Sequence, residues 1–361
     1  MLIAPRHLWS GGALREGLAV EVEAGAVAAL RPLGGDTPDA APRLLVPRPT
    51  DLQVNGGGGA LLNDDPTPEA MRAIAAAHRA AGTGWILPTL ITDAPEALEA
   101  AAEAAIACAG RGGVLGVHFE GPHIARPGVH DPARIRPLDA RTVAALRRLR
   151  EAGVPVLLTL APERADPGAI TSLAAMGVAV WAGHSEATAA EARASFAAGV
   201  TGVTHLFNAM PPMLARAPGL AGAALVSDAW CGIIADGHHL AWETVAVAIR
   251  ARPRPGRTLL VSDAMPSVGG PDRFRLGARE VRLRDGRLTT EDGRLAGAHL
   301  TMLEALRNVH RHAGASLAEA CAMATDAPRA ALGLPPQRVA PGTPLEDLAM
   351  LDDDLRLLPW P

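Results

Sequence analysis

The sequence predicts an α/β fold: a TIM-like (β/α)8 barrel with a small β domain built from the N- and C-terminal segments. From Asp51 onward, apolar runs alternate with alanine-rich stretches of helical character. Repeated alternation of strand and helix is typical of a parallel sheet, and seven or eight such units favour a closed barrel over an open sheet. A chain of 361 residues accommodates this barrel together with a small accessory unit.

The segment before the barrel reads as a small β unit. Leu18 to Leu30 and Arg43 to Val46 are short strand candidates separated by glycine and proline turns. The tail from Arg338 to Pro361 is expected to return to this unit. The predicted division of the chain is therefore a small β domain from residues 1–47 and 336–361, and a barrel from residues 48–335.

Helical spacing and start signals such as Ser, Thr or Asp define the barrel helices. They predict helices at Pro68–Ala81, Ala94–Ala109, Asp139–Ala152, Ala187–Ala198 and Ser316–Ala324. The apolar runs between them predict strands at Trp85–Leu87, Val114–Phe119, Val156–Leu160, Val178–Trp181, Gly202–Thr204, Gly232–Ala235 and Thr258–Val261. Alternating residues and glycine turns at Arg273–Leu295 predict a β-hairpin insertion.

The composition excludes several classes of function. A formal charge of −4 without any run of basic residues argues against nucleic acid or an anionic membrane surface as the main partner. Three widely spaced cysteines, odd in number, indicate reduced thiols and a cytoplasmic protein, and no secretory signal is visible at the N-terminus. The chain has no lysine, so a Schiff-base lysine, a phosphate-loop lysine and a carbamylated lysine bridging two metals are all impossible.

Four candidate metal-binding or proton-transfer groups each follow a short apolar run. Glu120 lies in HFEGPH, His184 in AGHSEAT, His205 in THLFNAM and Asp263 in VSDAM. In a parallel barrel the carboxyl ends of the strands meet at one rim, where barrel enzymes have their active sites. One carboxylate and two imidazoles suit a hydrolytic metal with an open position for water, whose pKa falls from ~15.7 towards ~7. Asp263 is then placed to remove a proton from that water and pass it to a leaving amine.

Each of these residues also has an ordinary structural interpretation. Glu120 is equally well read as a strand-end carboxylate facing water, and His184 or His205 as a hydrogen-bonded core histidine. The recurrence of all four at strand ends favours the functional interpretation.

Ten motifs in order give the chain a family resemblance. They are DLQVNGGGG, LPTLIT, HFEGPHI, TLAPE, AGHSEAT, THLFNAMPP, PGLAGA, CGIIADGHH, VSDAM and LAGAHLTM, spread over about Val46 to Arg329. In this respect the chain resembles the N-acetylglucosamine-6-phosphate deacetylase family of the amidohydrolase superfamily. The resemblance implies a barrel with a small β-sandwich, cytoplasmic homodimers, and hydrolysis of the acetamide of an amino-sugar phosphate to acetate and free amine.

The resemblance also implies roles for individual residues. Glu120, His184 and His205 match the metal ligands, and Asp263 matches the general base and acid. His130 matches a group that orients the acetamide or a sugar hydroxyl. The implied sugar-phosphate contacts are Asn208, the amide of Ala209, Arg216 and His239, the last two reaching across from the neighbouring subunit in the family.

The first barrel strand bears on the number of metals. Amidohydrolases with two metals usually carry His-x-His there, whereas this chain has Gln53 and Asn55, and amides are poor metal ligands beside imidazole. We therefore expect one divalent metal per subunit, zinc being the most plausible. Gln53 is a candidate hydrogen-bond partner of the ligand shell or its water, and a structural turn role for Asn55 is an equal alternative.

The sequence thus predicts a metal-dependent deacetylase of N-acetylglucosamine 6-phosphate, in amino-sugar catabolism or cell-wall recycling. The same chemistry on N-acetylgalactosamine 6-phosphate is the nearest alternative. A non-catalytic sugar-phosphate-binding regulator is the alternative from another class, and the presence of Asp263 beside a complete ligand trio argues against it. The chain ends at LPWP without the usual last strands of the small domain, so we expect a reduced sandwich.

Overall fold

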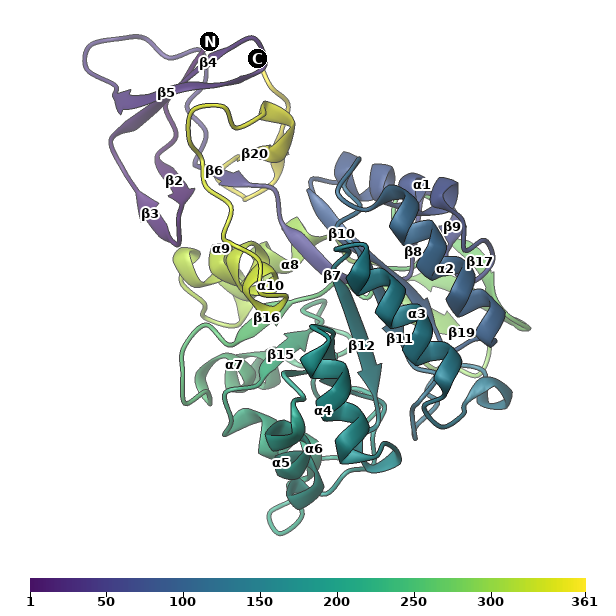
Figure 1. Ribbon diagram of the computed structural model, residues 1–361. Helices are drawn as coiled ribbons and strands as arrows, with labels where there is room; N and C mark the ends of the chain where they lie inside the picture. Colours follow the sequence, from purple (N-terminus) through teal and green to yellow (C-terminus); the bar gives the residue numbers. More distant parts are fainter.

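The computed structural model describes residues 1–361, and its central feature is one sheet of eight parallel strands (Figure 1). The strands follow one another in chain order around the sheet, each paired in parallel with the next. They are β7 (Thr50–Val54), β10 (Trp85–Ile91), β11 (Val117–Glu120), β12 (Val156–Leu160), β13 (Ala179–Ala182), β14 (Gly202–Val203), β15 (Trp230–Ile233) and β16 (Thr258–Leu260).

The two edge strands of this sheet, β7 and β16, meet at their carboxyl ends. Val54 and Ala264 form a parallel bridge, and the amide of Asp263 donates to the carbonyl of Gln53 at 3.0 Å. The sheet therefore closes on itself, and the predicted TIM-like barrel is confirmed.

Helices follow the barrel strands along the chain and cover them from outside (Figure 1). Their starts are encoded locally: α5, α8 and α9 each begin with a capping box, in which a Ser or Thr and a Glu three residues later satisfy each other's free amides. The helices are α1 (Pro68–Ala80), α2 (Pro95–Cys108), α3 (Ala140–Glu151), α4 (Pro167–Ala175), α5 (Ala189–Ala198), α6 (Gly219–Leu225), α7 (Trp242–Arg250), α8 (Met302–His312), α9 (Leu317–Ala324) and α10 (Asp326–Ala331). Short 3₁₀ turns occupy Pro132–Arg134, Pro162–Arg164 and Leu345–Asp347.

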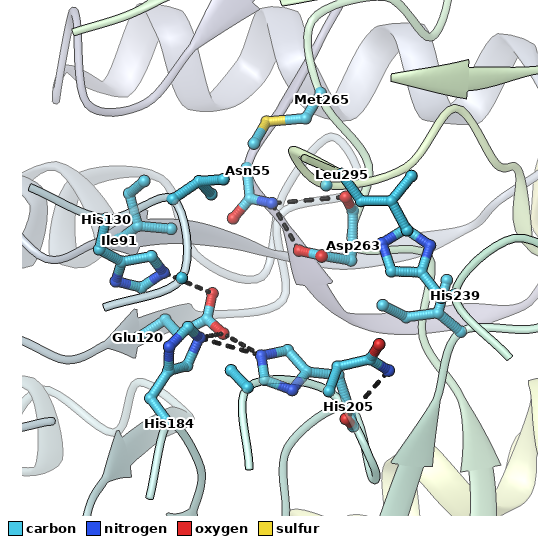
Figure 2. Close-up of a pocket in the computed structure, with 16 residues that line it drawn as sticks. Asn55, Ile91, Glu120, His130, His184, His205, His239, Asp263, Met265 and Leu295 are labelled. Carbon is cyan, nitrogen blue, oxygen red and sulfur yellow. Dashed lines mark hydrogen bonds and ion pairs between the residues drawn. The ribbon is translucent and has the colours of Figure 1, made fainter. Parts of the chain in front are cut away.

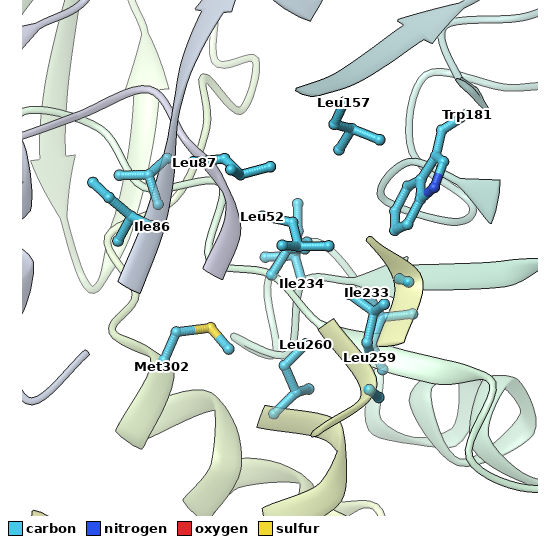
Figure 3. Packing of buried hydrophobic residues seen from close by; sticks show 14 of the residues in the cluster. Leu52, Ile86, Leu87, Leu157, Trp181, Ile233, Ile234, Leu259, Leu260 and Met302 are labelled. Carbon is cyan, nitrogen blue, oxygen red and sulfur yellow. The ribbon is translucent and has the colours of Figure 1, made fainter. Parts of the chain in front are cut away.

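The core is one cluster of 76 buried apolar residues inside the barrel and between barrel and helices (Figure 3). One of the largest buried side chains in the core is Trp181 on β13. It has room because the facing residue on β14 is Gly202, where a Cβ would lie only 2.4 Å from the indole. Met302, the first residue of α8, is fully buried in the same cluster. A rigidly filled barrel holds the strand ends in fixed positions.

The predicted hairpin insertion is a three-stranded antiparallel sheet between β16 and α8. It consists of β17 (Arg273–Leu276), β18 (Arg279–Arg284) and β19 (Arg287–Thr290). Its apolar face packs with Leu61, Ile91 and Met265 in a separate buried cluster, so the sheet is attached to the rim of the barrel where strands end. A two-stranded ribbon, β8 (Gly56–Gly57) with β9 (Ala60–Leu61), follows β7 at the same rim.

Two further small sheets contain the chain ends (Figure 1, upper left). In one of them the C-terminal strand β20 pairs with β6, so the tail does return to the N-terminal segment and supplies two strands there. The sheets have the orders β1-β4-β5 and β21-β20-β6-β2-β3. Their strands are β1 (Leu2–Ile3), β2 (His7–Ser10), β3 (Ala13–Arg15), β4 (Leu18–Glu23), β5 (Ala26–Pro32), β6 (Leu44–Pro47), β20 (Leu348–Leu351) and β21 (Leu357–Leu358).

Candidate active site

The barrel fold brings the four strand-end residues together at one rim, around one cavity (Figure 2). Glu120 is the last residue of β11, and His184, His205 and Asp263 lie two, two and three residues after the ends of β13, β14 and β16. The backbones of His184, His205 and Asp263 have φ values of 48°, 30° and 52°. Such left-handed conformations cost ~1–3 kcal/mol each in non-glycine residues and persist where the surrounding structure enforces them, most often at functional sites.

One oxygen of Glu120 is the centre of a buried polar cluster. Its Oε1 lies 3.1 Å from Nε2 of His184 and 2.8 Å from Nε2 of His205, and the two imidazole nitrogens lie 3.1 Å apart. All three side chains are at most 5% exposed. The possible ligand atoms of the trio lie within 4.8 Å of one another, close enough to coordinate a single ion.

The donor set of this trio fits a divalent metal. Nδ1 of His184 lies 2.6 Å from the carbonyl oxygen of Arg126, to which it donates, and this leaves Nε2 with the lone pair that a metal ligand needs. Two imidazole nitrogens and one carboxylate are the ligands of catalytic zinc sites that keep a position open for water or substrate. Gln53 and Asn55 offer only amides, and the trio is the one cluster of carboxylate and imidazole groups close enough together to hold a metal ion.

The two amides of the first strand instead connect the trio to Asp263. Nε2 of Gln53 lies 3.1 Å from Oε1 of Glu120 and 3.1 Å from Oδ1 of Asp263. The Nδ2 of Asn55 lies 2.7 Å from that same oxygen of Asp263 (Figure 2). Asp263 is therefore a hydrogen-bonded carboxylate in the cavity wall, outside the ligand trio but linked to it by one side chain.

Burial sets the protonation of these groups. Burial, followed by the negative charge of Glu120, raises the pKa of Asp263 to about 6. Burial opposes ionisation of Glu120 too, but the imidazoles of His184 and His205 beside it lower its pKa well below the usual range. The pKa of His205 is raised: burial alone would lower it, but the hydrogen bond to Glu120 has the larger effect. The site thus combines one firmly ionised carboxylate, Glu120, with a second, Asp263, whose pKa is close to neutral pH. Such a pair suits proton transfer.

Most of the remaining candidate substrate residues line the same cavity, namely His130, Asn208, Ala209 and His239. Nε2 of His130 lies 3.9 Å from Oε2 of Glu120, and burial lowers the pKa of His130 well below its usual value, so its ring is neutral. His239 lies in the cavity of its own chain, which corrects the expectation that it enters from a neighbouring subunit. Arg216 is different: it is exposed on the loop between β14 and α6 and does not line the cavity.

Three supporting residues were not identified from the sequence. Thr92 holds His130 (Nδ1 to Oγ1, 2.8 Å), and Asp236 holds His239 (Nδ1 to Oδ2, 2.7 Å). Asn55, for which a turn role was an open alternative, contacts Asp263 directly. The spacing of Asp236 and His239 within ADGHH was the only local signal for any of these pairs.

Two other histidines lie outside the cavity lining. His123 is buried between the carbonyl of Arg136 and the hydroxyl of Thr142, at 3.1 and 3.2 Å, where it fastens the loop after β11 to α3. His238 is exposed beside His239. Neither is placed to contact a ligand in the cavity.

Comparison with known proteins identifies the family. Residues 44–344, most of the chain, match the amidohydrolase family. The chain belongs to that family. An N-acetylgalactosamine-6-phosphate deacetylase from Shewanella is 38% identical over 85% of this chain and 79% of its own length. The human N-acetylglucosamine-6-phosphate deacetylase is 32% identical over 88% of this chain and 82% of its own length. The amidohydrolase described here is therefore a member of the amino-sugar-6-phosphate deacetylase group.

Solved structures agree over almost the whole amidohydrolase chain. N-acetylglucosamine-6-phosphate deacetylase from Pasteurella multocida has a TM-score of 0.87 at 28% identity, covering 99% of this chain and 97% of its own. A mutant of the enzyme from Mycobacterium smegmatis, solved in complex with N-acetyl-D-glucosamine-6-phosphate, has a TM-score of 0.88 at 31% identity, covering 99% and 96%. None of the helices of the present chain is both long and apolar enough to span a membrane.

Proposed function

We propose that this amidohydrolase hydrolyses the acetamide of N-acetyl-D-glucosamine 6-phosphate to D-glucosamine 6-phosphate and acetate. The observation that carries the proposal is the placement of Asp263 in the wall of the cavity that holds the Glu120–His184–His205 trio. A binding protein for the same sugar needs neither the ligand trio nor a carboxylate poised near neutral pH. A role in amino-sugar catabolism or cell-wall recycling, in the cytoplasm, follows as part of the proposal.

The chain's own residues account for the proton transfers of amide hydrolysis. As a carboxylate, Asp263 takes a proton from the water whose oxygen attacks the amide carbon. As a carboxylic acid, it then gives that proton to the nitrogen as the C–N bond breaks, which yields acetate and a free amine. Asn55 and Gln53 hold Oδ1 of Asp263 during both steps, since each donates to that oxygen.

Glu120, His184 and His205 are the residues proposed to hold one divalent metal per subunit, with zinc the best match to two imidazoles and a carboxylate. When bound, such an ion lowers the pKa of a coordinated water towards ~7 and polarises the carbonyl of the amide. The neutral ring of His130 faces this centre and is proposed to orient the acetamide or a sugar hydroxyl.

On the sugar side of the cavity, Asn208, the amide of Ala209 and His239 are proposed to contact the substrate. Arg216 reaches a substrate only if it acts in another subunit, since it lies on an exposed loop of its own chain. We therefore propose a homodimer in which Arg216 completes the partner's site. Mixing Asp263→Asn chains with Arg216→Ala chains tests this: activity regained after subunit exchange supports sharing, and none regained despite proven exchange contradicts it.

N-acetylgalactosamine 6-phosphate is the second candidate substrate. Two relatives with that activity in their names are 38% and 34% identical to this chain, compared with 31–32% for the relatives named for the gluco epimer. The solved structures with TM-scores of 0.87 and 0.88 are of gluco enzymes. The epimers differ at a single hydroxyl, so the metal trio and Asp263 act identically on both.

Acetate release by the purified, metal-loaded chain tests the proposal directly. The panel comprises both N-acetylhexosamine 6-phosphates, the two unphosphorylated sugars and a simple acetamide. We expect rapid release from the gluco 6-phosphate and little from the others. Faster release from the galacto 6-phosphate would reverse the epimer assignment, and no release from any compound would contradict a hydrolytic function.

A further inference from the structure

One side of the catalytic cavity is apolar. Ile91, Val129 and Met265 line the cavity there, and all three side chains belong to, or pack against, the buried cluster formed with the hairpin insertion. Ile91 is 5% exposed and Met265 is 1% exposed. Gly297 leaves room for Met265, because a Cβ on this glycine would lie 2.6 Å from Cγ of the methionine. We call Ile91, Val129 and Met265 the apolar wall.

The apolar wall stands beside the candidate catalytic groups. Ile91 is the last residue of β10 and is paired in register with Glu120 on β11. Val129 lies on the segment after β11, and Met265 follows Asp263 by two residues. The wall therefore borders the place where the amide carbon of a substrate must lie, between the ligand trio and Asp263.

The candidate sugar contacts lie on the opposite side of the rim. Around the closed sheet, β10 is the second of the eight strands and β14 is the sixth, so the ends of these two strands face each other across the cavity. Ile91 ends β10, whereas Asn208 and Ala209 follow β14, and His239 follows β15. Figure 2 shows the same separation, with Ile91 on one side of the trio and His239 on the other.

The geometry of an amide then gives the direction of the acyl group. A secondary amide is planar and trans, so its acyl chain and the sugar carbon on its nitrogen point in opposite directions. With the sugar at Asn208, Ala209 and His239, the methyl of the acetyl group points at the apolar wall. This methyl is the least polar group of such a substrate, and contact with apolar side chains removes it from water.

A second hollow lies behind the apolar wall. Ile91, Val129 and His130 line both this hollow and the catalytic cavity, so they form the partition between the two spaces. The rest of the hollow is lined by the segments after β9, β10 and β11 and by the turn between β17 and β18. Ile91 is the one member of the wall that is both buried and in contact with the two spaces. We infer that the apolar wall limits the acyl group to the length of acetyl, and that Ile91 decides this limit; the inference rests on the proposed function.

The test measures release of the free amine from the N-acetyl, N-propionyl and N-butyryl forms of the preferred amino-sugar 6-phosphate. An extra methylene in an apolar pocket costs ~10–200-fold in kcat/KM, so the wild type should lose roughly tenfold or more with each added carbon. Ile91→Ala removes three carbons from the wall and should raise the butyryl-to-acetyl ratio of kcat/KM by roughly tenfold or more. Ile91→Val removes one carbon and should raise mainly the propionyl-to-acetyl ratio. The matched control is Leu288→Ala, which also removes three carbons from the same buried cluster but lines neither space, and it should keep the wild-type ratios.

Equal kcat/KM values of the wild type for the three acyl groups would overturn the inference, and so would ratios in Ile91→Ala equal to those in Leu288→Ala. Metal content and thermal unfolding are measured for every variant; if Ile91→Ala has lost metal or folded structure, Ile91→Val decides alone. If the wild type releases no amine from any of the three compounds, the proposed function fails separately. Calorimetric titration of the wild type and Ile91→Ala with the same compounds then decides the role of the wall: a shift of the dissociation constants towards the butyryl form supports it, and an unchanged ratio contradicts it.

Discussion

The side-chain amide of Asn55 donates a hydrogen bond to Oδ1 of Asp263 at 2.7 Å, shorter than the one that Oδ1 accepts from Gln53 at 3.1 Å. A hydrogen bond to an ionised group contributes ~1.5–3 kcal/mol. Asn55→Ala should therefore lower kcat roughly 10- to 100-fold by that estimate, with metal content unchanged. Asn308→Ala is the control. It too removes a hydrogen bond donated by a side-chain amide, here to the carbonyl of Ala235 at 2.9 Å. Equal activity of the two variants would show that Asp263 needs no such support.

Removing either imidazole of the trio should remove the metal. His184→Asn and His205→Asn each leave two of three ligands, so both should lose bound metal and activity together. His123→Asn is the matched control, because His123 is a buried, hydrogen-bonded histidine outside the cavity. Elemental analysis of the wild type should give close to one metal per chain. Two metals per active chain would overturn the single-site proposal.

Asp263→Asn should separate binding from turnover. The amide has the size of the carboxylate and keeps an oxygen for Asn55 and Gln53, but it cannot accept a proton from water. Loss of a proton-transfer group alone costs ~10²–10⁴ in rate. We expect at least this loss in kcat, with metal and substrate still bound in equilibrium dialysis. Retention of more than a tenth of wild-type kcat would assign the base to another residue.

The pH dependence of kcat/KM should report Asp263. Burial, then Glu120, raises its pKa to about 6, and the carboxylate is the active form, so activity should rise with pH through one ionisation. The positive charge of a bound divalent metal favours the carboxylate, which places this acid limb at or below pH 6 in the loaded enzyme. A rate profile flat down to pH 4, or a limb unchanged in shape in Asp263→Asn, would contradict the assignment.

Asp51 should control stability rather than rate. Burial raises its pKa to about 7 from 3.8, and its Oδ2 has no hydrogen-bond partner. The folded state thus holds a proton that the unfolded state releases, so this contribution to stability is present below pH 4 and is lost as the pH rises through 7. This difference in pKa between the folded and unfolded chain corresponds to roughly 4 kcal/mol of stability. Asp51→Asn should unfold in urea like the wild type at pH 4 and be more stable at pH 8; equal stability at pH 8 would refute this.

The strands and helices predicted with accurate bounds are those with a clear local pattern of apolar residues. Val156–Leu160 was predicted as a strand and is β12, and the helix predicted at Pro68–Ala81 is α1 within one residue. Helix α6 was missed because every residue of it is buried, which leaves no polar face and no helical period to detect, and two of its seven residues are glycine. Helix α8 was also missed, although Thr301 and Glu304 form a capping box at its start.

The candidate site was predicted from one rule, that polar residues after parallel strands converge. The rule located Glu120, His184, His205 and Asp263, and the structure brings all four to one cavity. It could not locate Asn55 beside Asp263, because that contact depends on how the last strand meets the first. Thr92 beside His130 is likewise a tertiary contact without a local signal. The division of the chain at residues 47 and 335, and the individual roles of the site residues, stay predictions.

The candidate site is complete only once the barrel has closed through Val54 and Ala264. Asn55 and Asp263 are 208 positions apart in the chain, and Gln53 and Glu120 are 67 apart. During synthesis, the segments that carry His184 and His205 leave the ribosome before Asp263 does. Asp263 is therefore the last of the four strand-end groups to be synthesised, and it joins the site only when the last strand closes the barrel against the first.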